Sequence, residues 1–130
     1  MKPLALGLFI LFSCLNGVDL VDAPRVSQGE ITFYLDLAYF VGEADHAYVE
    51  FYLMLFADQF ARHENGDNSC VTLKLSSEII DKSGVTVSAA SWTTQAMIAK
   101  GKPENLSTLA IYDQWTEQLK PGEYCLKVCV

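Results

Sequence analysis

The stretch that decides the fold is Ile31–Phe56, which reads ITFYLDLAYFVGEADHAYVEFYLMLF. Two long apolar runs are joined in it by the short polar segment Gly42–His46. Within each run, apolar side chains recur at every second position, and β-branched and aromatic residues dominate, which favours strand over helix. The sequence therefore predicts two long antiparallel strands that form a hairpin and are the largest source of core in the chain.

Both faces of the second run are rather apolar, because Tyr48, Tyr52, Met54 and Phe56 alternate with the aliphatic positions. An antiparallel sheet often leaves one face in water. The pattern therefore predicts either a central strand or an outer face that is covered by a partner or by further sequence. A helix is the alternative for Tyr48–Arg62; strand is favoured for its first part, and Ala57–Arg62 is left unassigned.

The rest of the body also has the pattern of an all-β protein. Turn-forming residues cluster at three places, and apolar and polar residues alternate between them. The expected turns are His63–Asn68, Asp81–Gly84 and Lys120–Gly122. The expected strands are a short one at Gln59–Arg62, then Ser69–Ile80, Val85–Trp92, Ser107–Trp115 and Glu123–Val130, with a looser connection at Gln95–Asn105 and a helical turn at Asp113–Leu119 as an alternative. Without alternation of strands and helices, this predicts an all-β fold, an antiparallel immunoglobulin-like sandwich of about seven strands.

The N-terminus has the pattern of a secretory signal peptide. Lys2 supplies the positive charge, and Leu4–Phe12 is an apolar run that is too short for a stable membrane anchor. Cleavage after Gly17 and cleavage after Ala23 are both open, although the second places Pro24 unfavourably. We therefore expect a signal peptide over residues 1–17, a tether over 18–29 and the β-sandwich domain over 30–130.

A second processing route involves Cys14. The segment Leu11–Cys14 resembles the lipobox of bacterial lipoproteins, in which the cysteine becomes the lipidated first residue of the mature protein. Phe12 is bulkier than the residue usual at that position. Lipidation of Cys14 would anchor the chain to a membrane, whereas ordinary cleavage would release it. The expected locations are the periplasm, the outer membrane as a lipoprotein, or the extracellular space.

The chain is acidic and apolar in composition. Its 130 residues carry a net charge of −7, and 51% of them are hydrophobic. This length fits one domain with a sizeable core. The negative charge argues against nucleic acid and against anionic lipid headgroups as partners. The simplest interpretation is that the acidic side chains keep a β-rich surface soluble.

Three segments, in order, resemble the β-sandwich region of bacterial GWxTD-domain proteins. They are Asp36–Phe40 with Gly42 and Tyr48–Tyr52, then Ile80–Gly84 leading to Ser91-Trp92, and then Leu119–Tyr124. The Gly-Trp-x-Thr-Asp motif that names the family is absent, since Ser91-Trp92-Thr93-Thr94 does not match it. The resemblance implies a sandwich module exported to the cell envelope and implies no activity. Members of that family are generally longer, so we expect this chain to be a partial product.

Few residues have the spacing of a metal site or a disulfide. His46 and His63 both fall in expected turns, where solvated histidines are common. Cys125 and Cys129 are too far apart along one extended strand to bond each other. Either of them could pair with Cys70 in an oxidising compartment, but three free thiols are the favoured alternative. No cofactor and no metal are expected.

Carboxylates offer two further candidates that we judge weak. Asp36 and Glu50 lie on neighbouring expected strands and could be mistaken for the acid pair of a glycoside hydrolase. The cluster Glu64, Asp67 and Asn68 has calcium-type oxygen ligands without the ordered spacing of a calcium loop. No catalytic triad, phosphate loop or dinucleotide motif is present. The sequence therefore predicts a protein that is not an enzyme.

Two function classes remain as hypotheses. The first is a non-catalytic exported module that binds a protein partner in the cell envelope or supports an assembly there. The second is a carbohydrate-binding sandwich that presents exposed aromatic rings, with Trp92, Tyr112 and Trp115 as the candidate ligand surface. Exposed coplanar rings would favour the second hypothesis, and burial of those rings would favour the first.

Overall fold

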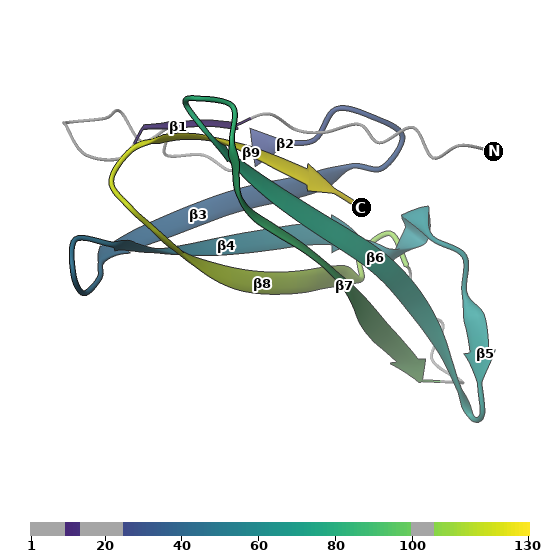
Figure 1. Cartoon of the computed structure of the whole chain (residues 1–130). Helices are drawn as coiled ribbons and strands as arrows, with labels where there is room; N and C mark the ends of the chain where they lie inside the picture. Colours follow the sequence, from purple (N-terminus) through teal and green to yellow (C-terminus); the bar gives the residue numbers. More distant parts are fainter. Residues whose placement is uncertain (1–9, 14–24, 100–105) are drawn as a thin grey trace.

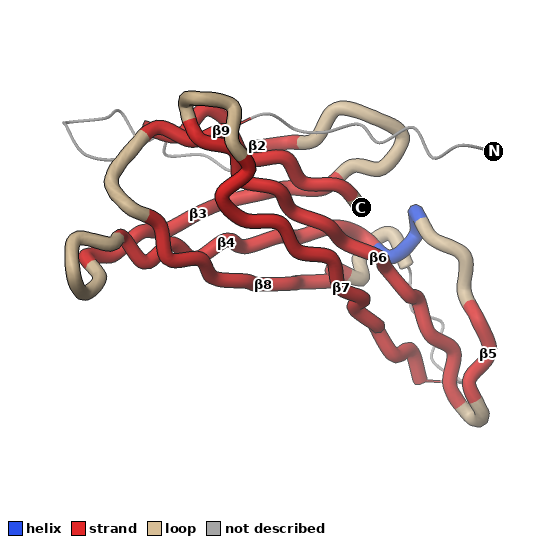
Figure 2. Tube along the Cα trace, in the orientation of Figure 1, coloured by secondary structure: helices blue, strands red, loops and turns tan. Residues whose placement is uncertain are grey.

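The computed structural model describes residues 10–13, 25–99 and 106–130 (Figure 1). The described chain is built almost entirely of strands, with one short 3-10 turn (Figure 2). In chain order, the elements are β1 (Ile10–Ser13), β2 (Arg25–Val26), β3 (Phe33–Val41), β4 (Ala47–Phe56), η1 (Ala57–Gln59), β5 (His63–Asn65), β6 (Asn68–Asp81), β7 (Thr86–Ala99), β8 (Ala110–Leu119) and β9 (Glu123–Cys129).

The strands form two antiparallel sheets. The first has the order β1-β9-β6-β5, and β7 also pairs with β6. The second has the order β2-β3-β4-β8. The two sheets lie as separate layers, and the far ends of β6 and β7 project with β5 beyond the second sheet (Figure 1). The predicted all-β antiparallel sandwich is confirmed.

The predicted hairpin is the centre of the second sheet. β3 and β4 pair in unbroken register from Phe33 opposite Leu55 to Val41 opposite Ala47. Because alternate side chains of a strand point to opposite faces, one face of this pair turns to the other sheet and forms the core. On β4, Val49 and Leu55 are fully buried. Truncating either side chain to alanine would cost about 1–5 kcal/mol, the larger value applying to leucine.

The core continues onto the first sheet along β6 and β9. The buried members on these strands are Val71, Leu73, Leu75, Ile79, Leu126 and Val128. These residues occupy alternate positions of each strand, which is the pattern expected of an inner sheet face. The predicted last strand therefore contributes Leu126 and Val128 to the core.

Three boundaries differ from the prediction. β5 begins at His63, inside the expected turn, and the turn itself is only Gly66-Asp67. β7 continues to Ala99, through much of the expected loose connection, because its pairing with β6 extends to Asn68 opposite Ala99. β8 is extended to Leu119 without a helical turn, because all ten of its residues pair with β4. In each case pairing with a neighbouring strand decided the local structure.

The N-terminal region contributes two strands. Ile10–Ser13, which lies in the expected signal peptide, pairs with β9 from Ile10 opposite Leu126 to Ser13 opposite Glu123. Arg25–Val26, which lies in the expected tether, pairs with β3. Both cleavage sites and Cys14 lie outside the described residues, so the signal peptide and the lipidation of Cys14 stay predictions.

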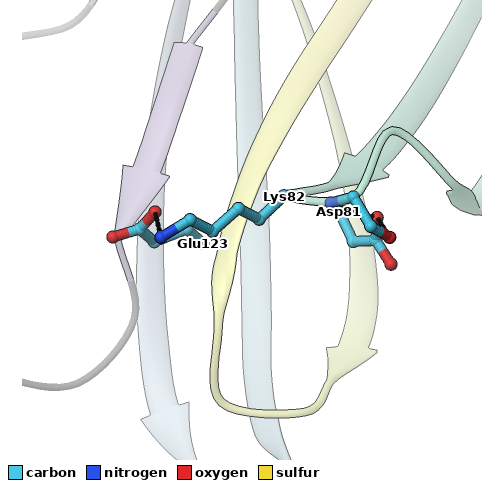
Figure 3. Close-up of polar contacts among 4 residues, drawn as sticks. Asp81, Lys82 and Glu123 are labelled. Carbon is cyan, nitrogen blue, oxygen red and sulfur yellow. Dashed lines mark hydrogen bonds and ion pairs between the residues drawn. The ribbon is translucent and has the colours of Figure 1, made fainter.

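The turn between β6 and β7 is organised by Asp81. Its Oδ1 accepts hydrogen bonds from the Ser83 hydroxyl at 2.6 Å, the Ser83 amide at 2.9 Å and the Val85 amide at 2.9 Å. Lys82 reaches Glu123 at the start of β9, with 3.3 Å between Nζ and Oε2 (Figure 3). That ion pair is solvent-exposed, so it contributes little to stability. The predicted turn at Asp81–Gly84 is confirmed.

Candidate functional site

The candidate site is the outer face of the second sheet, where β3, β4 and β8 each present a tyrosine in one of two adjacent rows. Tyr34 on β3 is opposite Met54 on β4, which is opposite Tyr112 on β8. In the next outward-facing row, Asp36 is opposite Tyr52, which is opposite Gln114. The rows arise because these positions have the same parity on each strand.

These residues line an open groove of about 680 Å³, which Leu53 and Asp113 also border. Tyr112 is the most exposed aromatic side chain on the groove, with 73% of its surface accessible. Tyr52 is also exposed, at 38%. The groove thus combines apolar rings with carboxylate, amide and hydroxyl groups, which is the mixture found where a sheet face binds a ligand.

The aromatic surface continues toward the hairpin tip. Phe40 on β3 is opposite Tyr48 on β4, and Phe40 is 52% exposed. Tyr39 and Val41 at the end of β3 are exposed as well. Both have the same parity as the buried Phe33 and Leu35, but β3 extends past the core at this end. We call the outward-facing set on this side of the molecule the tyrosine face; it consists of Tyr34, Asp36, Phe40, Tyr48, Glu50, Tyr52, Met54, Tyr112 and Gln114.

The tyrosine face is electrically negative. The outward-facing positions of β3, β4 and β8 carry two acidic residues, Asp36 and Glu50, and no basic residue. The Tyr52 hydroxyl donates a hydrogen bond to the Glu50 carboxylate. This hydrogen bond, followed by desolvation and the nearby negative charges, raises the pKa of Tyr52 above its ordinary value of 10.0. The Tyr52 hydroxyl is therefore engaged by its neighbour on the same strand.

The structure separates the three residues of the predicted ligand surface. Tyr112 and Trp115 are three positions apart on β8, an odd number, so they lie on opposite faces of the sheet. Trp115 points inward and stacks on Phe51, with ring centroids 5.1 Å apart. Trp92 comes from the first sheet and also packs on Trp115, at 5.1 Å. The predicted grouping is wrong, and parity along β8 is the sequence signal that could have shown it.

Two acidic residues of β8 point inward and tie the sheets together. Asp113 accepts hydrogen bonds from Trp92 Nε1 at 2.8 Å and from the Thr94 hydroxyl at 2.5 Å. Glu117 accepts one from the Ser88 hydroxyl at 2.8 Å. All three donors lie on β7, so these contacts join the edge strands of the two sheets. They are structural, and none belongs to the tyrosine face.

Asp36 and Glu50 both lie on the outer face of the sheet. In the register, Asp36 is opposite Tyr52 and Glu50 is opposite Ala38, so the two acids are diagonal neighbours. Glu50 is engaged by the Tyr52 hydroxyl, and Asp36 Oδ1 accepts from the Leu37 amide at 2.8 Å. Asp36 and Glu50 therefore supply carboxylate oxygens that can accept hydrogen bonds on the tyrosine face.

The histidines lie at opposite ends of the molecule. His46 is in the β3–β4 turn, where its Nδ1 lies 2.8 Å from the Ala44 carbonyl oxygen, and His63 is exposed on β5. Glu64 and Asp67 border the β5–β6 turn near His63. Over residues 25–99 and 106–130, no three acidic, histidine or cysteine side chains converge as a metal site would require.

The cysteines are separate thiols in the structure. Cys70, Cys125 and Cys129 are all free. Cys129 is opposite Ser76, which is six residues after Cys70 on the same strand, so this pair is about 20 Å apart. Cys125 is farther still, opposite Ile80. The proposed pairing of Cys70 with Cys125 or Cys129 is not formed, because a disulfide needs Cα atoms within about 7 Å.

Comparisons with protein-family models, with curated proteins and with solved structures found no match. The resemblance to GWxTD-domain proteins therefore stays a prediction from the residues. Within the described part of the chain, no helix has the length and apolar character needed to cross a bilayer.

Proposed function

We propose that the chain is a non-catalytic module of the cell envelope that binds a protein partner on the tyrosine face. The observation that carries the proposal is that Tyr34, Tyr52 and Tyr112 lie in two adjacent outward-facing rows around an open groove. Tyrosine is enriched at the energetic centres of protein interfaces, because a large ring is buried while its hydroxyl keeps a hydrogen bond. Export to the envelope is supported by the signal-peptide pattern of residues 1–17.

Exposure of the rings supports a surface that a partner covers. Tyr112 and Phe40 lie at two ends of the tyrosine face and leave most or half of their surface in water. Burying apolar surface of this kind stabilises a complex by about 25 cal/mol per Å² before the costs of association. The carboxylates of Asp36 and Glu50 make a basic or hydrogen-bond-donating partner surface the best complement.

Carbohydrate binding is the second candidate. Here the supporting observation is that Tyr112 and Tyr34 lie in one row while Asp36 and Gln114 lie in the next. Rings can stack on the apolar face of a sugar, and the polar row offers acceptors for its hydroxyl groups. In this candidate, Tyr34 and Tyr112 supply the stacking rings, a role that the sequence predicted for Trp92 and Trp115 together with Tyr112.

Photo-crosslinking in the envelope tests the first candidate. A benzophenone amino acid at position 112 is expected to capture a discrete protein, and Tyr34→Ser combined with Tyr52→Ser is expected to abolish the capture. The matched control carries the same probe in place of Thr72, which is exposed on the other sheet. Equal capture from both positions, or none from position 112, would reject the protein-binding proposal.

Affinity electrophoresis through polysaccharide gels separates the two candidates. Retardation of the purified chain that is lost in Tyr112→Ala and kept in Thr72→Ala would support carbohydrate binding. Mass spectrometry of the mature N-terminus tests export independently. An unprocessed Met1 in envelope fractions would count against the signal peptide.

A further inference from the structure

The edge of β7 is a long strand edge without the features that usually protect such edges. Among the described residues, β7 pairs with β6 alone, over the full length of Thr86–Ala99. Its other edge therefore presents backbone N–H and C=O groups that no described strand satisfies. Strand edges are normally blunted by charged residues, by proline or by short length. β7 has 14 residues and contains no charged residue and no proline.

The other edges of the two sheets are shorter than β7 or carry charged residues. β9 has only seven residues and carries two charged side chains, Glu123 and Lys127, and β1 pairs with part of its outer edge before any removal of the signal peptide. β2 has two residues and β5 has three, so neither offers a long template. β2 leaves the edge of β3 open over residues 36–41, a stretch half as long as the regular part of β7 that begins with the charged Asp36. β8 has ten residues, but Asp113 and Glu117 point inward from it, a device that disfavours strand addition. Sequence and structure thus single out β7.

A β-bulge shortens the part of β7 that another strand could pair with. The register with β6 shifts between Ile79 opposite Ser88 and Ile80 opposite Thr86, so Val87 is an extra residue on β7. Such a bulge twists the strand and interrupts an edge. The regular part of β7 therefore runs from Ser88 to Ala99. Antiparallel addition of a strand of that length would form about ten backbone hydrogen bonds, similar to the number in a typical protein interface.

We infer that this edge pairs with β7 of a second copy of the chain, in antiparallel orientation about a two-fold axis. Each copy carries a net charge of −7, so two copies repel each other over most of their surface. An uncharged strand is the place where they can meet without opposing like charges directly. By contrast, β8 paired with itself about Trp115 would set Asp113 opposite Glu117 of the other copy.

The side chains on β7 suit self-pairing in the register that sets Thr93 opposite Thr93 of the second copy, at the middle of the regular edge. Exposed Ala89, Ala90 and Ser91 are small and leave the backbone accessible, while exposed Thr93 and Met97 supply larger neighbours. Threonine and aliphatic pairs across strands are each favourable relative to alanine pairs. The two-fold arrangement would join the two first sheets into one continuous sheet and would leave the tyrosine face of each copy open.

Sedimentation velocity over a dilution series of the full exported chain tests this inference. The wild-type chain is expected to dimerise with increasing concentration. Thr93→Lys and Thr93→Glu, each in the middle of the regular edge, are expected to be monomeric over the same range. A mixture of these two variants is expected to regain dimers, because opposite charges then meet across the interface. The control is Thr116→Lys, at an exposed position of β8, which is expected to dimerise like the wild type.

Two outcomes would overturn the inference. The first is a wild-type chain that stays monomeric at every concentration. The second is a dimer that both Thr93 variants leave intact. Thr93→Lys places a second positive charge opposite Lys74 on β6, so its fold is checked by circular dichroism. Thr93→Glu places a negative charge opposite the same lysine, which is favourable. It replaces Thr93→Lys in the test if that variant is poorly folded. The result is independent of the proposed function, because Thr93 variants are expected to keep crosslinking from position 112.

Discussion

Trp92 donates a 2.8 Å hydrogen bond from its indole nitrogen to the carboxylate of Asp113, and this contact joins the edge strand of one sheet to the edge strand of the other. Thr94 donates to the same carboxylate at 2.5 Å. Because β7 and β8 belong to different sheets, no backbone ladder links them. Side-chain contacts such as these therefore position the two sheets at this side of the sandwich.

Asp113→Ala is expected to destabilise the fold by about 2 kcal/mol. The substitution leaves the Trp92 N–H and the Thr94 hydroxyl without their acceptor in a partly buried place, and an unsatisfied donor costs about 1–3 kcal/mol. Urea denaturation measures the change. Gln114→Ala, at the exposed neighbouring position, is the control and is expected to shift stability by less than about 0.5 kcal/mol. Equal effects from both variants would show that the contact does not hold the sheets.

Tyr124→Phe is expected to cost about 1 kcal/mol, the usual contribution of one intramolecular hydrogen bond. The Tyr124 hydroxyl donates to the Lys120 carbonyl oxygen at 2.7 Å and fastens the turn before the last strand. The comparison is Tyr112→Phe, which removes a hydroxyl from the most exposed aromatic side chain of the tyrosine face. Thermal unfolding should show a lower melting temperature for the first variant and a change near zero for the second. The reverse order would contradict this assignment.

The β3–β4 turn contains two residues that its backbone conformation disfavours. Ala44 and Asp45 have φ values of +50° and +62°, and the His46 amide donates to the Glu43 carbonyl oxygen at 3.1 Å. A two-residue turn with positive φ at both positions prefers Asn-Gly. The double variant Ala44→Asn, Asp45→Gly is therefore expected to stabilise the hairpin by about 1 kcal/mol.

The control for that turn is Gly84→Ala. Gly84 already has a φ of +85°, so alanine there is expected to destabilise the fold by about 1 kcal/mol. Urea denaturation of both proteins measures the two shifts. A loss of stability in the Asn-Gly variant would mean that the turn has a different conformation in solution.

Asp81 makes stability depend on pH in the acid range. Its hydrogen bond from the Ser83 hydroxyl, followed by that from the Val85 amide, lowers the pKa of Asp81 below its ordinary value of 3.8. A carboxyl whose pKa is lower in the folded chain stabilises the fold above its unfolded-state pKa. That contribution is lost as the pH falls through the folded-state pKa. Ser83→Ala removes the first donor and is expected to raise the pKa of Asp81 toward its ordinary value.

Carbon-detected NMR titration of the Asp81 carboxyl measures that shift. Glu123→Gln serves as the control, because it breaks the exposed ion pair with Lys82 and leaves the hydrogen bonds of Asp81 in place. An unchanged Asp81 titration in Ser83→Ala would show that the hydroxyl does not hold the carboxylate.

Cys70, Cys125 and Cys129 are expected to be free thiols in the purified chain. Alkylation without prior reduction, followed by peptide mass spectrometry, should label the partly exposed Cys125 and Cys129 in the native state. Cys70 is buried and should react only after unfolding. Because no bond links the strands, reductant should leave the melting temperature unchanged. A Cys70 peptide crosslinked to either of the others would contradict the register of β6 and β9.

Much of the fold follows from local pattern. The alternation in Ile31–Phe56 predicts the β3–β4 pair, and the turn residues of Asp81–Gly84 predict the reversal before β7. Both are short-range effects, in which side-chain parity and turn chemistry act within a few residues. The extension of β7 to Ala99 is different, because it depends on pairing with Asn68, far away in the chain.

What the sequence by itself determined is the all-β class, the central hairpin and the acidic, single-domain character of the chain. Only the tertiary structure decided which aromatic residues share a surface. Tyr34, Tyr52 and Tyr112 meet because β4 pairs with β3 on one side and β8 on the other, whereas Trp92 and Trp115 turn into the core. The physical reason is that strand order and register are set by burial of the whole core, so contacts between distant strands cannot be read from any one of them.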